Sequence, residues 1–315
     1  MDLSKILKSK ISFIDIGSRW GLLEKWEQIG EDNMEIVLFE PDKSEFNLLR
    51  KKYPKSRIFK KAISDKVGFT HFFKTQEPGK SSILFPNHEF IQRFENYNDY
   101  RIKSQKKIEM DNLFNILRKN SINPDAIKID AQGMSFEILK GLKSKIRDLV
   151  WIEFESEFHE FYKNQKVFSD IDLLLKKQGF ELLDLNKHWY KYNRQILGRG
   201  QVTFADFIYI KKIEDITHLN IDKYIKLLYL LINFNYVDVA YFIYKKFDNN
   251  FKIEQKTQNI LKNILKSESK RNDKLNKFIK FLLKINNSIL IRLSKNQKNW
   301  YYSNYGNDSN SIDFR

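Results

Sequence analysis

Cysteine is absent from this chain of 315 residues, which excludes disulfides, cysteine-ligated zinc, iron–sulfur clusters and thiol nucleophiles. Long hydrophobic runs are also missing, and the densest one, Leu227–Phe234, is far shorter than the ~20 residues of a membrane span. The first ten residues, MDLSKILKSK, lack the apolar core and cleavage site of a secretory signal. We therefore expect a cytoplasmic protein in a reducing compartment.

What the chain has in excess is positive charge, with a formal net charge of +16. The segment from Lys252 to Lys298 alone holds 13 Lys or Arg residues and three acidic residues. Such a segment can bind nucleic acid, anionic lipid or an acidic glycan. The simpler interpretation is a lysine-rich, solvated face. The overall content of 42% hydrophobic and 30% charged residues is that of an ordinary globular protein.

Residues 1–212 alternate short β-rich runs with helical stretches, which predicts a mostly parallel sheet covered by helices. The expected strands are Phe13–Ile16, Glu35–Phe39, Arg57–Ile63, Ala126–Ile129, Leu149–Phe154, Glu181–Leu185 and Val202–Ile210, with a small extra strand at Phe69–Lys74. The expected helices are Lys43–Lys52, Asp111–Lys119, Met134–Leu142 and Ser169–Gln178. No long helix separates the last two strands, so we expect them to pair antiparallel at an edge.

After about Lys212, β-rich runs cease and apolar residues recur at helical spacing. Tyr224–Phe234 and Val237–Phe247 are expected to form two helices, and Ile253–Leu283 and Ser288–Leu293 further basic ones. We therefore expect a helical, basic extension at residues 213–300. The Asn- and Ser-rich tail, residues 301–315, is expected to be disordered.

Acidic residues follow several of the expected strands. The first strand leads into FIDIGSRWG, with Asp15, Gly17 and Gly21, and the second ends at Glu40. The fourth ends at Asp130, and the fifth carries Glu153, Glu155 and Glu157. Ligands of open α/β sheets lie beyond these carboxyl ends, so a line of carboxylates is expected there.

This pattern favours a nucleoside-bearing ligand with positive charge. An acid at the end of the second strand, Glu40, can accept hydrogen bonds from both ribose hydroxyls. A pyrophosphate cofactor would call for G-x-G-x-x-G, which G-S-R-W-G does not match. S-adenosylmethionine has no phosphate and carries a sulfonium and an amino group, which carboxylates attract.

Several segments, in this order and spacing, resemble the FkbM-type methyltransferases. They are FIDIGSRWG, LFEPDKSEFNLL, KAISDKVGFTHFF, SSILFPN, IKIDAQGMSFEILKGL, ESEFHEFYKNQKVFSDIDLLLKKQGFELLDL and GRGQVTFADFIYI. The resemblance runs from about Ser12 to Ile210 and implies a class I, Rossmann-like fold that uses S-adenosylmethionine. It also implies O-methylation of a sugar or another small hydroxylated acceptor. Two departures are Gln132, where many members have Glu, and Arg19-Trp20, where Asn or Gly is commoner.

The motifs and the resemblance together name a set of expected cofactor-binding residues: Asp15, Gly17, Ser18, Arg19, Gly21, Glu40, Pro41, Asp42, Ile63, Ser64, Asp65, Asp130 and Gln132. No metal site is predicted.

Methyl transfer to a hydroxyl requires a group that accepts its proton. Asp130 is the first candidate, although it could instead orient the cofactor or cap the following helix. Glu155 could be the base, bind a sugar hydroxyl or form a salt bridge. His159 is the best-placed histidine, although a lone histidine beside aromatic residues is more often packed or exposed.

Five further residues are expected to line an acceptor site, namely Ser81, Ser82, Tyr162, Arg199 and Gln201. The expected partner is a glycan or glycolipid-type acceptor. A nucleic-acid acceptor is disfavoured, because DAQGMS stands where amino-methylating enzymes carry Asp/Asn-Pro-Pro-aromatic, and cytosine-C5 chemistry needs a cysteine. A degenerate fold acting as a scaffold is the non-enzymatic alternative.

Three roles for the helical extension stay open: an oligomerisation or protein-docking surface, a peripheral contact with the anionic inner face of a membrane, and nucleic-acid binding.

Overall fold

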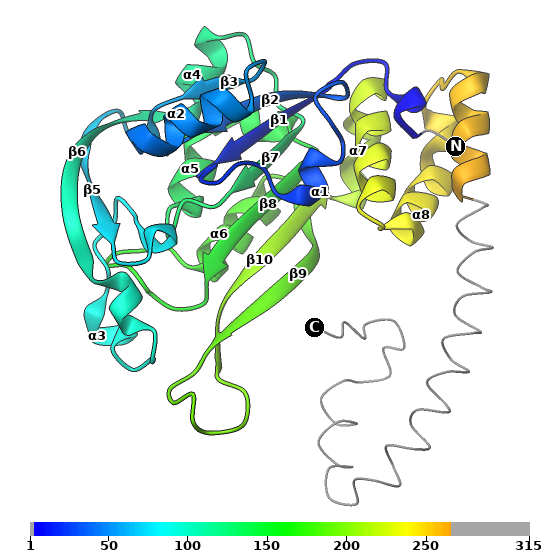
Figure 1. Ribbon diagram of the computed structural model, residues 1–315. Helices are drawn as coiled ribbons and strands as arrows, with labels where there is room; N and C mark the ends of the chain where they lie inside the picture. The colour runs from blue at the N-terminus through cyan, green and yellow to red at the C-terminus, as the bar shows by residue number, and fades with distance from the viewer. Residues whose placement is uncertain (1–2, 266–315) are drawn as a thin grey trace, which may run out of the picture. The chain divides into compact units, whose positions relative to one another are not determined.

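The computed structural model describes residues 3–265 and is built around a seven-stranded sheet of order β3-β2-β1-β7-β8-β10-β9 (Figure 1). Its strands are β1 Ile11–Ile16, β2 Met34–Phe39, β3 Arg57–Phe59, β7 Ala126–Ile129, β8 Trp151–Glu157, β9 Phe180–Tyr190 and β10 Gln201–Lys211. The first five run parallel, and β10 is antiparallel to both β8 and β9. This confirms the predicted Rossmann-like sheet with an antiparallel last strand.

Helices cover one face of this sheet with an aliphatic core. The helices labelled in Figure 1 are α1 Glu24–Glu27, α2 Lys43–Lys52, α3 His88–Ile91, α4 Leu113–Lys119, α5 Ser135–Gly141, α6 Phe168–Lys177, α7 Ile221–Asn233 and α8 Val237–Phe247. Leu117 of α4, Ile138 of α5 and Ile171 of α6 pack with Ile14 and Ile127 of the central strands. Every residue of β1 is buried, as expected for a parallel strand covered on both sides.

The opposite face is covered by aromatic residues and by α7. Phe13, which alternates with Ile14 along β1, stacks on Trp26 of α1 with ring centroids 3.9 Å apart. Phe234, at the end of α7, contacts Trp26 at 4.8 Å and Trp151 of β8 at 5.1 Å. These aromatic contacts fix α7 against the sheet.

An ion cluster also joins α7 to the sheet. The buried Asp125 carboxylate accepts a hydrogen bond from the Ser12 backbone N–H at 2.8 Å. It also pairs with Lys223 at 2.6 Å and Lys226 at 2.9 Å. β10 ends at Lys211, beside the expected boundary near Lys212, and α7 and α8 belong to the same compact unit as the sheet, Asp2–Thr257.

A smaller three-stranded sheet, of order β4-β6-β5, corrects two sequence predictions. Its strands are β4 Ala62–Ser64, β5 Gly68–Thr75 and β6 Ile102–Asn112. The single strand expected at Arg57–Ile63 is wrong, because β3 pairs with β2 whereas β4 pairs with β6. The helix expected from Asp111 begins at Leu113, and β6 itself was not predicted. Most of β6 is exposed, so its polar sequence carries no alternation to detect.

Short 3-10 helices complete the described chain: η1 Leu3–Ile6, η2 Pro78–Lys80, η3 Tyr97–Tyr100, η4 Lys143–Asp148, η5 Ile213–His218 and η6 Asp248–Asn250. Residues 255–265 are helical, within the predicted helix Ile253–Leu283. Residues 253 and 254 are described and are not helical, whereas residues 266–283 of that predicted helix, the predicted helix Ser288–Leu293 and the predicted tail lie outside the described residues. Between residues 3 and 265, no helix is both long and apolar enough to cross a bilayer.

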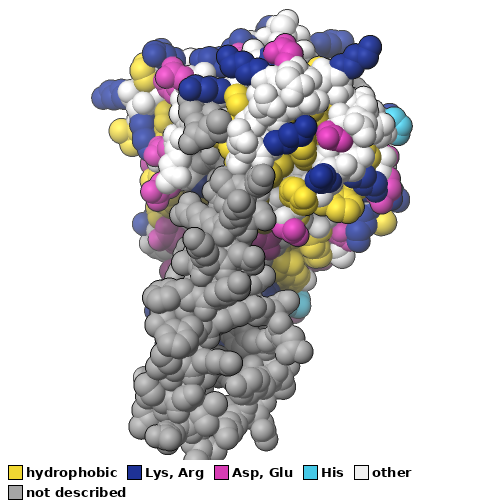
Figure 2. All heavy atoms as spheres, turned by 90° about the vertical axis from the view of Figure 1, so that its right-hand side faces the viewer, with side chains coloured by type: hydrophobic (Ala, Val, Ile, Leu, Met, Phe, Trp, Pro, Cys, Tyr) yellow, Lys and Arg dark blue, Asp and Glu magenta, His cyan; other side chains and the backbone are white. Residues whose placement is uncertain are grey.

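The face of the molecule that carries α7 and α8 bears charges of both signs. Figure 2 shows Lys and Arg side chains on this face with acidic and hydrophobic side chains between them. On α8 the half-exposed rings of Tyr241 and Phe242 lie beside Lys245 and Lys246. The described part of the extension is therefore not a single-sign basic surface.

Candidate functional site

The main cleft of the described chain lies where β1, β2, β7 and β8 end, and has a volume of about 470 Å³. Its position is the one that open α/β sheets use for ligands. It gathers many of the predicted residues: Gly17, Arg19, Gly21, Glu40, Pro41, Ile63, Ser81, Ser82, Asp130, Gln132 and Glu155 all line it. Trp20, Lys80, Lys128 and Met134 also form part of its wall.

The loop after β1 is held tightly against its neighbours. The Ser18 hydroxyl donates to the carbonyl oxygen of Asp15 at 2.8 Å and accepts from the Phe39 N–H at 3.2 Å. Gly17 has φ +80°, and a Cβ there would overlap the backbone carbonyl of Asp130. Gly17 is therefore required for the packing of two loops, a different reason from the ligand approach that the sequence suggested. Ser18 supports this loop without lining the cleft.

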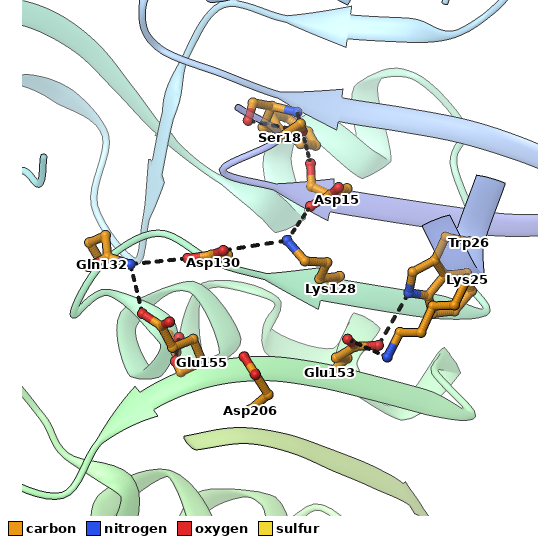
Figure 3. A network of polar contacts seen from close by, with 12 residues as sticks. Asp15, Ser18, Lys25, Trp26, Lys128, Asp130, Gln132, Glu153, Glu155 and Asp206 are labelled. Carbon is orange, nitrogen blue, oxygen red and sulfur yellow. Dashed lines mark hydrogen bonds and ion pairs between the residues drawn. The ribbon is translucent and has the colours of Figure 1, made fainter. Parts of the chain in front are cut away.

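A buried lysine, Lys128, connects the carboxyl ends of β1 and β7 (Figure 3). Lys128 of β7 lies 3.4 Å from Asp15 and 3.8 Å from Asp130, measured from Nζ to the carboxylate oxygens. Burial raises the pKa of Asp15 to about 6, although Lys128 opposes this shift. Burial alone would lower the pKa of Lys128, but Asp15, Asp130 and Glu153 raise it above its ordinary value. Asp15 thus lies behind the cleft wall and holds Lys128.

Glu40 lies at the end of β2 and faces the cleft, with only 3% of its surface exposed. One of its oxygens accepts a hydrogen bond from the Asp42 N–H at 2.7 Å. Burial raises the pKa of Glu40 to about 7, although this hydrogen bond and Arg19 oppose the shift. A buried carboxylate beside a cleft is suited to accept hydrogen bonds from two adjacent hydroxyls.

Besides Asp15 and Ser18, three more residues of the expected cofactor set, Asp42, Ser64 and Asp65, lie outside the cleft lining. Asp42 caps α2 through the Ser44 N–H and pairs with Lys74, and these contacts hold its pKa low against the effect of burial. Asp65 pairs with Lys140 at 2.8 Å, and the Ser64 hydroxyl bonds to Asp65 at 3.3 Å. Asp42 and Asp65 thus each have protein partners, and their part in cofactor binding stays a prediction.

Gln132 connects two carboxyl groups at the floor of the cleft (Figure 3). Its Nε2 donates to Glu155 at 2.7 Å and to Asp130 at 3.2 Å. Its Oε1 accepts from the Tyr162 hydroxyl at 3.0 Å, and its backbone carbonyl accepts from the Ser82 hydroxyl at 2.6 Å. Gln132 has φ +34°, an uncommon conformation for a side-chain-bearing residue, which these contacts stabilise.

The two linked carboxyl groups differ in their surroundings. The Asp130 side chain is 41% exposed. Burial and the charge of Asp130 raise the pKa of Glu155 well above its ordinary value, although Lys80 opposes the shift. Asp206 of β10 is the cross-strand partner of Glu155 in the sheet. Such divergent environments are typical of acid–base pairs.

Lys80 and Lys128 are site residues that the sequence analysis missed. Lys80 lines the cleft, and its Nζ lies 5.0 Å from the ring of Phe204 and 5.9 Å from that of Tyr190. Burial alone would lower its pKa, but Glu155 and Tyr190 raise it. A signal existed for Lys128, since a lysine inside the apolar strand AIKI needs a buried acidic partner. The exposed-looking turn PGK gave none for Lys80.

The remaining predicted residues lie beside the cleft and do not line it. Tyr162 is fully buried, and its hydroxyl oxygen lies 3.0 Å from the carbonyl oxygen of Lys80 as well as from Gln132. His159 lies 2.9 Å from Gln201, between the two side-chain nitrogens, and packs near Phe90. Arg199 lies over the Trp189 ring at 5.6 Å. The fold thus brings Asp130 and Glu155 together in the cleft. His159, Arg199 and Gln201 instead make their contacts at the β9–β10 hairpin, outside the cleft lining. The catalytic and acceptor roles of these residues stay predictions.

Comparison with known proteins identifies the family of this chain. The family model for the methyltransferase FkbM domain matches residues 20–182 of the chain. The chain belongs to the FkbM methyltransferase family. No curated protein matches the chain.

Solved structures share with this FkbM methyltransferase only a distant likeness. Magnesium protoporphyrin IX methyltransferase from Synechocystis, with bound SAM, is 8% identical over 65% of this chain and 71% of its own, with a TM-score of 0.34. Precorrin-6y C5,15-methyltransferase from Geobacter metallireducens is 12% identical over 66% of this chain and 85% of its own, with a TM-score of 0.33. The likeness carries no argument about the substrate.

The cofactor of this methyltransferase is S-adenosylmethionine, and the cleft residues fit it. Glu40 offers a buried carboxylate to ribose hydroxyls, and Asp130 lines the same cleft. Pro41 and Ile63 give apolar contact for an adenine ring. This set of acids suits a donor that carries a cation and no phosphate.

A Glu40→Gln variant is expected to separate binding from stability. Because the native pKa is about 7 and the ordinary value is 4.5, ionising Glu40 costs stability as pH rises from 4.5 to 7. Above pH 7 the free energy of unfolding of the variant should exceed that of the native protein by about 1–3 kcal/mol. At pH 4.5 the two proteins should be equally stable. It should bind S-adenosylmethionine about 10- to 100-fold more weakly, since an uncharged acceptor replaces a carboxylate.

Calorimetry and urea unfolding at the two pH values measure both effects. Glu35→Gln is the control, because Glu35 is a half-exposed acid of the same strand that pairs with Arg57. A stability gain that is equal at both pH values would contradict the assigned pKa.

Proposed function

We propose that this protein transfers the methyl group of S-adenosylmethionine to a hydroxyl oxygen of a sugar, glycan or glycolipid-type acceptor. The observation that carries the proposal is the pair of Asp130 and Glu155, joined by Gln132 in the cleft that holds Glu40. Family membership supports methyl transfer, and the carboxyl pair supports a hydroxylated acceptor.

Residues at the cleft floor have separate roles in the proposed reaction. When bound, S-adenosylmethionine supplies an electrophilic methyl group. Asp130 accepts the proton of the acceptor hydroxyl as its oxygen becomes nucleophilic, because an alcohol is too weak an acid to lose that proton beforehand. Gln132 orients the Asp130 carboxylate through its Nε2 at 3.2 Å.

Glu155 is suited to a different role from that of Asp130. Burial and the charge of Asp130 raise its pKa and so favour the protonated carboxyl group, which can donate a hydrogen bond to an acceptor oxygen. Lys80, in the cleft wall, supplies a positive charge that balances this acidic floor. Carboxyl, amide and ammonium groups around one cleft match the many hydroxyls of a sugar.

Methyl-labelled S-adenosylmethionine, incubated with the protein and either a glycolipid extract or total RNA, tests the proposal. We expect label in the glycolipid extract alone, and loss of that label with Asp130→Asn. Label in RNA alone would overturn the acceptor class. Calorimetry that detects no binding of S-adenosylmethionine by the native protein would instead favour the scaffold alternative.

A further inference from the structure

The connection between β9 and β10, residues 191–200 and here called the hairpin tip, extends away from the sheet at the lower part of Figure 1. Leu197 is 97% exposed and Ile196 is 65% exposed. Exposure of two adjacent aliphatic side chains to water, at the end of a projecting loop, is unfavourable in free energy. The tip therefore presents apolar side chains without a core of its own.

Basic and aromatic residues precede and follow these two side chains along the chain. From residue 187 to residue 201 the chain has four basic residues and no acid, namely Lys187, Lys191, Arg194 and Arg199. Arg194 pairs with Glu95 at 3.1 Å. Two half-exposed rings lie nearby in the chain, Trp189 near the end of β9 and Tyr192 in the hairpin tip. Trp and Tyr of this kind favour the level of lipid headgroups.

We propose that the hairpin tip inserts Ile196 and Leu197 into the interface of an anionic lipid bilayer. The aliphatic side chains would reach the boundary between headgroups and acyl chains, and the basic residues would meet anionic headgroups. Nucleic acid fits the tip less well, because phosphates offer no partner for two aliphatic side chains. The combination of apolar end and cationic flank favours lipid.

The base of the hairpin connects this surface to the cleft wall. The Tyr190 hydroxyl lies 3.1 Å from that of Tyr100, and Lys80 of the cleft lies 5.9 Å from the Tyr190 ring. Membrane docking would thus bring the cleft near lipid-linked acceptors. That consequence rests on the proposed function, whereas insertion of the tip does not.

The absence of cysteine makes the test direct, because a single introduced cysteine takes a spin label at one site. The full-length Leu197→Cys variant is labelled and mixed with vesicles of phosphatidylcholine, or of phosphatidylcholine with about one-third phosphatidylserine. Val67→Cys is the matched control, since Val67 is 62% exposed in the turn between β4 and β5. With anionic vesicles, we expect the label at 197 to become shielded from a water-soluble nickel chelate, and the label at 67 to stay accessible.

Co-sedimentation adds a second measurement without labels. The Ile196→Ser/Leu197→Ser variant should bind anionic vesicles about 10- to 100-fold more weakly than the native chain, and Val67→Ser equally well. Absence of native binding, equal binding by the tip variant, or a label at 197 that stays in water on bound protein would each overturn the proposal. The last result would assign the membrane contact to another part of the chain.

Discussion

Gly17→Ala is expected to abolish detectable binding of S-adenosylmethionine and to lower the free energy of unfolding by more than about 3 kcal/mol. The added Cβ would overlap the backbone carbonyl of Asp130, and this atom cannot move without separating the loops after β1 and β7. The φ of +80° adds a further cost of about 1–2 kcal/mol for any residue with a Cβ. Calorimetry and urea unfolding measure the two effects.

Gly30→Ala is the control for this experiment, because Gly30 has φ +79° and a Cβ there would meet nothing within 4 Å. It should lose only the conformational cost of about 1–2 kcal/mol and bind the cofactor normally. Equal behaviour of the two variants would show that contact between the loops does not matter, and would contradict the packing described for Gly17.

Asp130→Asn is expected to lower the methyl-transfer rate by about 10²- to 10⁴-fold while leaving the fold intact. The amide keeps the size of the side chain and an oxygen for the Gln132 hydrogen bond, but it cannot take the acceptor's proton. Under saturating donor, the loss should appear in kcat. Single-turnover transfer of labelled methyl groups to the glycolipid extract measures it.

Asp148→Asn is a matched control for Asp130, because its side chain is 40% exposed against 41% for Asp130, and each lies near a lysine. It should transfer methyl groups at the native rate. If Asp130→Asn retains more than about a tenth of the native rate, Asp130 orients other groups and Glu155 becomes the leading candidate base.

The sequence was sufficient for most of the central sheet, though not for the separation of β3 from β4, and for one side of the cleft. Parallel strands end at one edge, so Glu40 after β2 and Asp130 after β7 had to come near each other once those strands were recognised. β6 was missed because its exposed, polar residues lack the alternation that a buried face imposes. The alternation of apolar and polar residues identifies a strand with one buried face, but it is absent from a strand that is exposed on both faces.

Side-chain partnerships across the fold were harder to predict. Nothing near Asp42 indicated that Lys74, from another sheet, would hold it, and nothing near Lys80 indicated its place beside Glu155. His159 was singled out from its position after β8, but the loop turns it towards Gln201. These contacts depend on how distant segments meet, which spacing along the chain does not encode.

The packing of Phe234 on Trp26 and Trp151 sets a limit on how far the protein can be trimmed. A chain cut after Lys211 would leave two indoles and the Asp125 carboxylate facing solvent, and would invite self-association through the bared wall. The shared family segment, residues 20–182, would be less stable still, since it lacks two interior strands of the sheet, β1 and β10. The shortest fragment expected to fold on its own is therefore longer than the segment that the family model matches.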